Sequence, residues 1–200
     1  MSACRLLILT ATCCLYVHGL MLDGRRKSMQ PMGGRLGVDY QQLQQFLCAW
    51  PWKVEPVRRV LVRKAVEVIG PDAWVVDDTG FKTDGISSPS VSRQYSGALG
   101  KIGNCQIAVS IHAATDKASC PLDWRLYVPE AWGDTCADTN EQVETVAARR
   151  AKAQIPDVQR HRTKWAMALE MIDELGVWGY RRKIMTATPA MARSPRSAAS

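Results

Sequence analysis

The sequence changes character at Ala73-Trp74-Val75-Val76-Asp77-Asp78-Thr79-Gly80, a short apolar run of strand type that ends in two adjacent acids. The run follows Gly70-Pro71, a pair that ends a helical pattern. Two neighbouring carboxylates at a strand end are costly unless solvent, a cation or a metal compensates them. Because Mg²⁺ prefers carboxylate and water oxygens, Asp77 and Asp78 are candidate metal ligands. The alternative is a strand-to-loop turn in which Asp78 caps the backbone.

Downstream of this run, apolar residues recur at every second position, which is the period of a strand. We therefore expect an antiparallel meander with one buried face, formed by strands at roughly 73–78, 104–113 and 121–128. A helix at 163–175 should pack on this sheet, and a fourth strand near 182–187 should lie beside the first. Residues 79–104 are rich in Gly and Ser, and we expect them to form loop and turn.

Residues upstream of 70 follow the helical period. The pattern predicts helices at about 3–22, 25–36, 40–49 and 56–69, with Asp39 as the cap of the third. In the fourth helix one apolar side is predicted to face the core, and it holds Val57, Val60, Leu61, Ala65, Val68 and Ile69. Four cations lie mostly off that side: Arg58, Arg59, Arg63 and Lys64. The later helix at 163–175 has a comparable apolar side, made of Trp165, Ala168, Leu169, Ile172 and Leu175.

This order of elements predicts an α+β (mixed α/β) protein in three parts. Residues 1–70 form a helical N-terminal region, which is a candidate DNA-binding region. Residues 71–187 form the sheet domain. Residues 188–200 have the Ala, Ser, Pro and Arg composition of a disordered tail.

The chain carries a formal net charge of +7 and a pI near 9.2, which favours nucleic acid or an anionic surface as partner. The alternative for the cationic helix is a solvated face with no partner. Seven cysteines without a C-x-x-C pair suggest neither a zinc site nor a disulfide framework, and they fit a reducing cytoplasm. The N-terminal apolar run lacks a small-residue cleavage site and is too short for a bilayer, so we expect neither export nor membrane insertion.

The segment after Gly80 combines cations, an amide, an aromatic ring and glycines. Its residues Arg93, Gln94, Tyr95 and Lys101 could contact phosphates and stack on a base. It lacks the G-x-x-x-x-G-K-[ST] spacing of phosphate loops, so nucleotide hydrolysis is disfavoured and no small-molecule substrate is expected. His112 has no Ser or Cys partner at a catalytic motif spacing, and we interpret it as structural.

Several ordered motifs resemble one known family. The strand at 75–82 resembles the first catalytic strand of insertion-sequence transposases of the seven-hundred-and-one group, which are DDE superfamily endonucleases. Similar segments follow in the family's order: Arg93-Gln94-Tyr95-Ser96-Gly97, Lys101, Asn104-Cys105-Gln106, residues 120–127 and Lys164-Trp165. Gly19-Leu20 and Arg26-Lys27-Ser28 resemble its helical N-terminal part. The resemblance covers roughly residues 16–187.

This resemblance implies an RNase H-like fold in which three acids hold two Mg²⁺ ions for attack on a DNA phosphodiester. Asp77 would be the first, catalytic acid, because the family pattern resembles Asp-x-Thr here, with Asp78 as the alternative metal ligand. The second acid would follow the helix at 163–175 in a motif like Asp-Ala-Gly-Tyr-Gly, and a Glu would come from a much later helix. The implied partners are DNA at the insertion-sequence ends and either a second copy or a full-length transposase.

The sequence departs from the family pattern at Thr188-Pro189-Ala190-Met191-Ala192. Deleting the first base of a GC-rich codon run for Asp-Ala-Gly-Tyr-Gly would give these five residues. We therefore expect a frameshift before the second acid, an out-of-frame tail at 188–200, and an incomplete RNase H-like domain at 71–187 that does not cut DNA. The alternative to a transposase that acts by descent is a non-catalytic remnant that binds DNA or a transposase.

Overall fold

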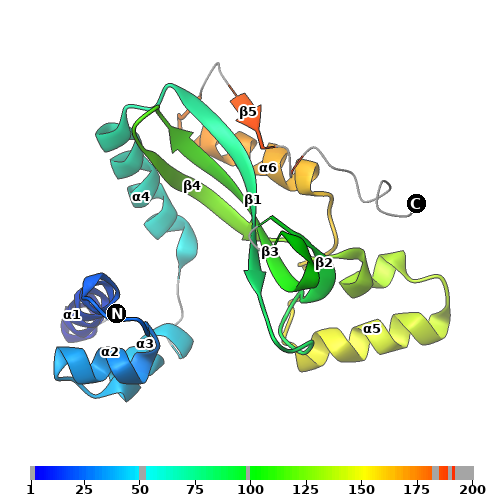
Figure 1. Cartoon of the computed structure of the whole chain (residues 1–200), viewed down its shortest axis with the longest axis horizontal. Coiled ribbons are helices and arrows are strands. Elements are labelled where there is room, and N and C mark those ends of the chain that lie inside the picture. The colour runs from blue at the N-terminus through cyan, green and yellow to red at the C-terminus, as the bar shows by residue number, and fades with distance from the viewer. Residues whose placement is uncertain (1–2, 50–52, 98–99, 182–184, 189–190, 192–200) are drawn as a thin grey trace. The chain divides into compact units, whose positions relative to one another are not determined.

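The computed structural model describes residues 3–49, 53–97, 100–181, 185–188 and 191. The chain divides into two compact units, Met1–Val54 and Glu55–Ser200. Among the described residues the first unit is helical, and the second holds the sheet (Figure 1). The helix α4 (Val54–Ile69) falls almost wholly in the second unit, so this division lies ahead of the helix, whereas the sequence suggested a boundary near residue 70.

The described part of the first unit has the three helices that the sequence predicted. They are α1 (Ala3–Met21), α2 (Met29–Leu36) and α3 (Tyr40–Cys48). The expected cap of α3 is present, because the Asp39 carboxylate accepts a hydrogen bond from the Gln41 amide at 2.9 Å. The Tyr16 and Phe46 rings lie 6.1 Å apart and link α1 to α3. Among the described residues, no helix has both the length and the apolar character that a bilayer span requires.

The second unit contains a five-stranded sheet. Its strands are β1 (Ala73–Lys82), β2 (Ser92–Ser96), β3 (Lys101–Ala114), β4 (Ser119–Leu126) and β5 (Met185–Ala187). The long strand β3 pairs antiparallel with β1, with β4 and with β2, which confirms the predicted meander. β5 pairs parallel with β1, with Val76 opposite Ala187, so the fourth strand lies beside the first as predicted. Residues 182–184 of that prediction lie outside the described residues.

The loop predicted for residues 79–104 was wrong in large part. β1 continues through Lys82, β2 occupies Ser92–Ser96, and β3 already begins at Lys101. Gly80 allows this extension, because β2 passes close to it: a Cβ added at Gly80 would lie 2.7 Å from the Ser96 Cβ. Such a distance is inside van der Waals contact, so only glycine fits here.

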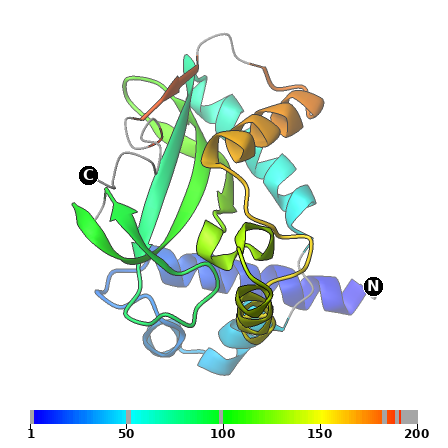
Figure 2. The same cartoon turned by 90° about the vertical axis from the view of Figure 1, so that its right-hand side faces the viewer.

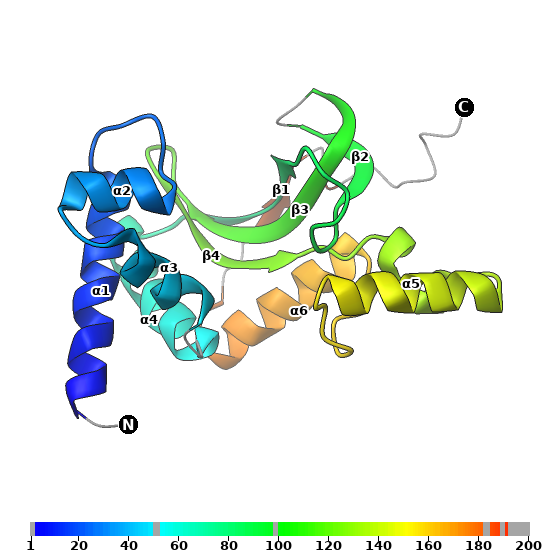
Figure 3. The ribbon, with the colours of Figure 1, turned by 90° about the horizontal axis from the view of Figure 1, so that it is seen from below.

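Two helices cover one face of the sheet. Figures 2 and 3 show α4 and α6 (Lys164–Val177) on the same side of it. Their buried residues join alternate residues of the strands in one core, which includes Val62, Trp74, Val76, Ile107, Val109, Ile111, Met167, Met171 and Leu175. The other face, the open face, carries the intervening residues Val75, Asp77, Ser110, His112 and Trp124. The mixed α/β class is confirmed, and the order of strands and helices is consistent with an RNase H-like domain.

The side that α4 turns to the core differs from most of the predicted one, whereas the predicted side of α6 is confirmed in part. In α4, Val62 is buried, whereas Val57, Val60, Leu61 and Val68 are 47–80% exposed. In α6, Ala168 and Leu175 of the predicted side are buried and Ile172 packs against the core. Met167 and Met171 are buried as well, whereas Trp165 and Leu169 are exposed. Both helices therefore carry apolar residues on two sides. In α4 the sequence period alone did not identify the side that faces the core.

A third helix, α5 (Asn140–Lys152), and two short 3-10 helices, η1 (Glu130–Trp132) and η2 (Asp134–Cys136), follow β4. Arg150 of α5 is buried, and its guanidinium donates to the carbonyls of Trp132, Pro156 and Gln159. The Arg149 guanidinium lies 3.7 Å from the Trp132 ring centroid. These cations hold the segment between β4 and α6 in place and are not free for a ligand.

Candidate active site

Asp77 lies on the open face of β1, opposite Ser110 of β3. The chain leaves β5 directly beside it, because the Thr188 amide continues the parallel pairing and donates to the Val76 carbonyl at 3.0 Å. The Thr188 hydroxyl donates to the Asp77 carboxylate at 2.7 Å. The structure thus brings position 188 into direct contact with the acid at position 77, across 111 residues of sequence.

Ser110 and His112 complete the polar surroundings of Asp77. The Ser110 hydroxyl lies 3.0 Å from His112 Nε2 and donates a longer hydrogen bond, at 3.4 Å, to the Asp77 carbonyl. Burial lowers the pKa of His112 below its ordinary value of 6.5, and the nearby Asp77 charge opposes this shift. His112 is therefore neutral at pH 7 and gives this site no positive charge.

Asp78 lies on the other face of β1, because side chains alternate along a strand. There it forms an ion pair with Lys164 at the start of α6, and its side chain is only 10% exposed. The Lys164 ammonium lies 5.5 Å from the centroid of the Tyr127 ring. The two adjacent acids therefore point to opposite sides, and the structure does not bring Asp77 and Asp78 to one metal ion.

Cys105 and Tyr127 lie on the same covered side as Asp78. Burial raises the pKa of the Cys105 thiol, which is fully buried and close to Lys164 and Asp78. Burial also raises the pKa of the Tyr127 hydroxyl. Both groups stay protonated at neutral pH, so Cys105 is a structural thiol and not a nucleophile.

The residues predicted to form a phosphate-contacting loop belong instead to β2 and to the start of β3. Arg93 and Tyr95 are exposed, and their register places them on the open face with Asp77. The Gln94 amide points to the other side and donates to the Cys105 carbonyl at 3.1 Å, so it serves the sheet. Lys101 is exposed at the first residue of β3.

The predicted DNA-contacting cations of α4 do not form one surface. Arg58 is 14% exposed and binds Asp123 of β4 and Glu174 of α6. Arg59 pairs with Glu55 at 3.1 Å, and its guanidinium lies 5.3 Å from the centroid of the Trp178 ring. Arg58 is therefore held inside the unit, and Arg59 remains half exposed.

The other two α4 cations are exposed at separate places. Lys64 pairs with Glu67 of its own helix at 2.9 Å, and both side chains are exposed. Arg63 lines a shallow hollow together with Arg59, Val60, Trp178 and Tyr180. Arg59 and Arg63 are thus the α4 cations that share one patch.

Arg58 belongs to a larger ion network that the sequence did not reveal. Arg125 binds both Glu170 and Glu174, and its Nε lies 3.6 Å from the buried Asp123 carboxylate. Arg162 also binds Glu170. The sequence spacing indicates part of this network, because Asp123 and Arg125 are two apart on a strand and Glu170 and Glu174 are four apart on a helix, so each pair shares one face. Nothing local showed that α4 would supply a third cation.

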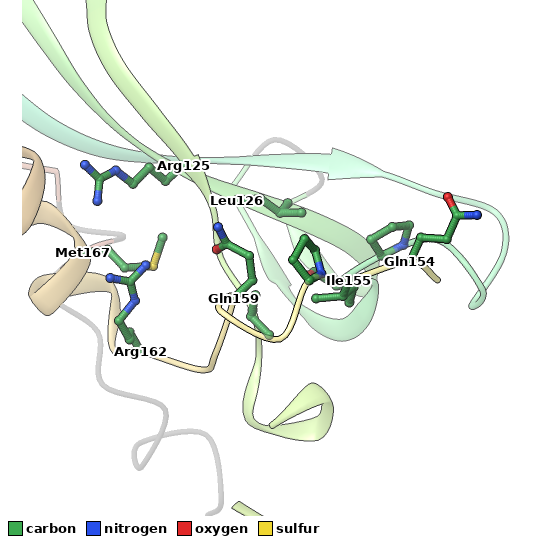
Figure 4. A pocket seen from close by; sticks show the side chains of 11 residues that line it. Arg125, Leu126, Gln154, Ile155, Gln159, Arg162 and Met167 are labelled. Atoms are coloured by element: carbon green, nitrogen blue, oxygen red, sulfur yellow. The ribbon is translucent and has the colours of Figure 1, made fainter. Parts of the chain in front are cut away.

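A cavity of about 410 Å³ opens beside this network (Figure 4). Arg125, Gln159, Arg162 and Met167 project toward it from β4, from the segment before α6 and from α6 itself. Both arginines are already bound by glutamates, so the cavity offers no free positive charge to an anion. It lies on the covered side of the sheet, and Asp77 is not among its lining residues.

Residues 9–190 match the sequence family described as DDE superfamily endonuclease. The chain belongs to this family. It is also 28% identical over 186 residues to a protein of Microchaete diplosiphon named "Probable transposase for insertion sequence element IS701". That alignment covers 91% of this chain but only 43% of the relative, so the chain spans less than half of the relative's length. No solved structure matches the chain.

The DDE superfamily match includes every element around Asp77, from β1 through β5 to Thr188. The acids that give this superfamily its name hold metal ions, so the fit of such a site can be tested on the residues present. Among the residues that the structure describes, no group of three His, Cys, Asp or Glu side chains could hold a metal ion. At the Asp77 site the contacting side chains are the hydroxyl of Thr188 and the Ser110–His112 pair, which do not fit a site for two Mg²⁺ ions.

Proposed function

We propose that this chain carries the first part of the catalytic domain of an insertion-sequence transposase and that it binds DNA in the cytoplasm without cutting it. Asp77 corresponds to the first acid of the domain, and position 188 corresponds to the second. The hydrogen bond from the Thr188 hydroxyl to the Asp77 carboxylate supports this proposal. It joins the two positions at which the order of the family motifs places the first and the second acid. A polar, uncharged side chain therefore stands where a second carboxylate would complete the site.

The same observation argues against DNA cleavage by this polypeptide. Two-metal cleavage needs carboxylates that bridge the ions, and Asp77 alone cannot do so. Mg²⁺ is the family's expected cofactor, but the described residues at this site do not fit it. We therefore infer that the chain is a DNA- or transposase-binding remnant of a transposase, and no catalytic step is assigned to it.

DNA incubated with the purified chain and either Mg²⁺ or Mn²⁺ should remain uncut, because removing one essential carboxylate abolishes a metal-assisted step. The assay uses linear and supercoiled DNA, and the Asp77→Ala variant serves as the matched control. Nicking by the unmodified chain that disappears in Asp77→Ala would contradict the proposal. Equal traces of nicking in both proteins would identify a contaminant and leave the expected result intact.

We propose that DNA contacts fall at two places. The open face offers Arg93 for a phosphate and the rings of Tyr95, Phe81 and Trp124, which are 47–53% exposed, for stacking on bases. Lys101, at the first residue of β3, pairs with Ser96, the residue that follows Tyr95. On α4, the contact falls to the patch of Arg59 and Arg63 and not to Arg58, whose guanidinium is occupied by two carboxylates.

The contribution of α4 to DNA binding can be measured from the salt dependence of the affinity. If Arg59 and Arg63 each neutralise a phosphate, the double variant Arg59→Ala/Arg63→Ala should reduce the slope of log K against log salt by about 1.8. The measurement is a fluorescence-anisotropy titration at several salt concentrations. The matched control is Lys117→Ala/Lys152→Ala, which removes two exposed cations elsewhere and should leave the slope nearly unchanged. An unaltered slope in the α4 variant would remove this helix from the DNA surface.

A further inference from the structure

The helices α2 and α3 are joined by a tight turn of three residues, Gly37 to Asp39. Gly37 has a φ of 66°, a left-handed conformation that glycine adopts without strain. The Val38 amide donates to the Gly33 carbonyl at 3.0 Å, which closes the end of α2. The Asp39 side chain then caps the start of α3. Two short helices joined by a three-residue turn that contains glycine are the arrangement of a helix-turn-helix unit.

Close packing fixes α3 against the helices before it. A Cβ added at Gly33 of α2 would lie 2.9 Å from the Val38 carbonyl oxygen and 3.0 Å from the Tyr40 Cβ, so only glycine fits there. The helix α1 contacts both α2 and α3 (Figure 3). On α3, Leu43 and Phe46 are buried. One side of α3 is therefore fixed by packing, which leaves the opposite side for a ligand.

The outward side of α3 consists of amides. The helix carries no charged side chain, and four of its residues are exposed glutamines: Gln41, Gln42, Gln44 and Gln45. With 3.6 residues per turn, Gln41 and Gln45 lie opposite the buried residues, and Gln44 lies beside them. A glutamine amide forms two hydrogen bonds with adenine in the major groove, where adenine presents the N7 acceptor and the N6 donor. The outward side is therefore suited to base edges, and its chemistry favours adenine.

Cations lie beside the turn. Arg35, in the last turn of α2, donates to the Arg26 carbonyl at 2.8 Å, so the loop at 25–27 lies next to the end of α2. Four exposed cations are found here: Arg25, Arg26, Lys27 and Arg35. The first unit holds six Lys or Arg residues against two acids, and one of these acids, Asp39, caps α3. Cations and amides match the two kinds of contact with DNA, because phosphate contacts position a protein and base contacts specify the sequence.

From this geometry we propose that residues 29–48 are a helix-turn-helix unit with α3 as its recognition helix. The helix enters the major groove of duplex DNA and reads adenine through Gln41, Gln44 and Gln45, while the cations beside the turn contact phosphates. This inference rests on the DNA binding proposed above and adds sequence recognition to it. The contacts proposed on the open face and on α4 lie in the second unit and bind by charge and stacking, so they do not select a sequence.

Selection by the full chain from a pool of duplexes with a randomised central segment tests the recognition helix. The unmodified chain should enrich a short sequence that contains adenine and bind it about a hundredfold more tightly than the unselected pool. Gln41→Ala/Gln45→Ala should bind the selected sequence about tenfold more weakly and the unselected pool equally well, because its phosphate contacts remain. Alanine favours helix, so α3 should stay folded. The control is Gln159→Ala, at an exposed glutamine of the second unit, which should change neither affinity.

Replacing the selected adenines by 7-deazaadenine, which lacks the N7 acceptor, locates the contact in the major groove. The replacement should weaken binding of the unmodified chain about tenfold and leave binding of Gln41→Ala/Gln45→Ala unchanged. Duplex binding without an enriched sequence would overturn the recognition helix and leave the proposed DNA binding intact. The same holds for an enriched sequence that the double variant binds as tightly as the unmodified chain does. A chain that binds no duplex would overturn both proposals.

Discussion

Arg58→Ala should lower the free energy of unfolding by about 3 kcal/mol, which is typical of breaking a buried ion pair on one side. The Asp123 side chain is 1% exposed, and Arg58 is one of the two cations that compensate it. Arg58 also binds Glu174 at 2.8 Å, so one residue ties α4 to both β4 and α6. Removing it would leave a buried carboxylate with the more distant Arg125 Nε as its nearest remaining cation.

Urea unfolding followed by circular dichroism measures this effect, and Arg59→Ala is the matched control. Arg59 is the neighbouring residue, but its pair with Glu55 is exposed on both sides, so its loss should cost about 0.5 kcal/mol or less. The comparison also separates a structural arginine from a DNA-binding one. If both variants lose the same small amount of unfolding free energy, Arg58 does not stabilise the core and is again a candidate for DNA contact.

Thr188→Asp should convert the Asp77 site from one that ignores divalent cations into one that depends on them. Without metal, a second carboxylate would stand where the Thr188 hydroxyl now donates to Asp77, so repulsion replaces a hydrogen bond. We expect a loss of about 1–2 kcal/mol in unfolding free energy. Mn²⁺ at about a hundred times its dissociation constant should then raise the unfolding free energy of the variant by about 2.7 kcal/mol, because it binds the folded state alone.

Thermal and urea unfolding with and without Mn²⁺ give the result, with Thr188→Asn as the control. The asparagine has nearly the same shape as the aspartate and can donate to Asp77, but it adds no charge, so its stability should not respond to Mn²⁺. The unmodified chain should not respond either. A Thr188→Asp variant with no cation-dependent gain would show that positions 77 and 188 do not form a metal-holding pair.

Most strands and helices could be predicted because their apolar periods are local properties of the sequence. β2 could not, since Ser92–Ser96 has no apolar alternation and becomes a strand only by pairing with β3. Its close approach needs Gly80, which from the sequence looked like an ordinary turn residue. Strand β1 therefore extends four residues beyond its predicted end at 78.

The orientation of α4 depended on partners far along the chain. The helix has apolar residues on two sides, and the side that faces the sheet is the one carrying Arg58, whose partners Asp123 and Glu174 lie 65 and 116 residues away. No local period contains that information. The choice between Asp77 and Asp78 was similar, because the sequence places two equivalent acids together and only the sheet register separates their faces.

Electron paramagnetic resonance of Mn²⁺ bound to Thr188→Asp, combined with either Asp77→Asn or Asp78→Asn, tests the assignment of Asp77 most directly. Asp77 shares its face with position 188, whereas Asp78 is paired with Lys164 on the other side of the strand. The account predicts that Asp77→Asn abolishes Mn²⁺ binding by the Thr188→Asp chain and that Asp78→Asn preserves it. Binding that survives Asp77→Asn but is lost in Asp78→Asn would contradict the account.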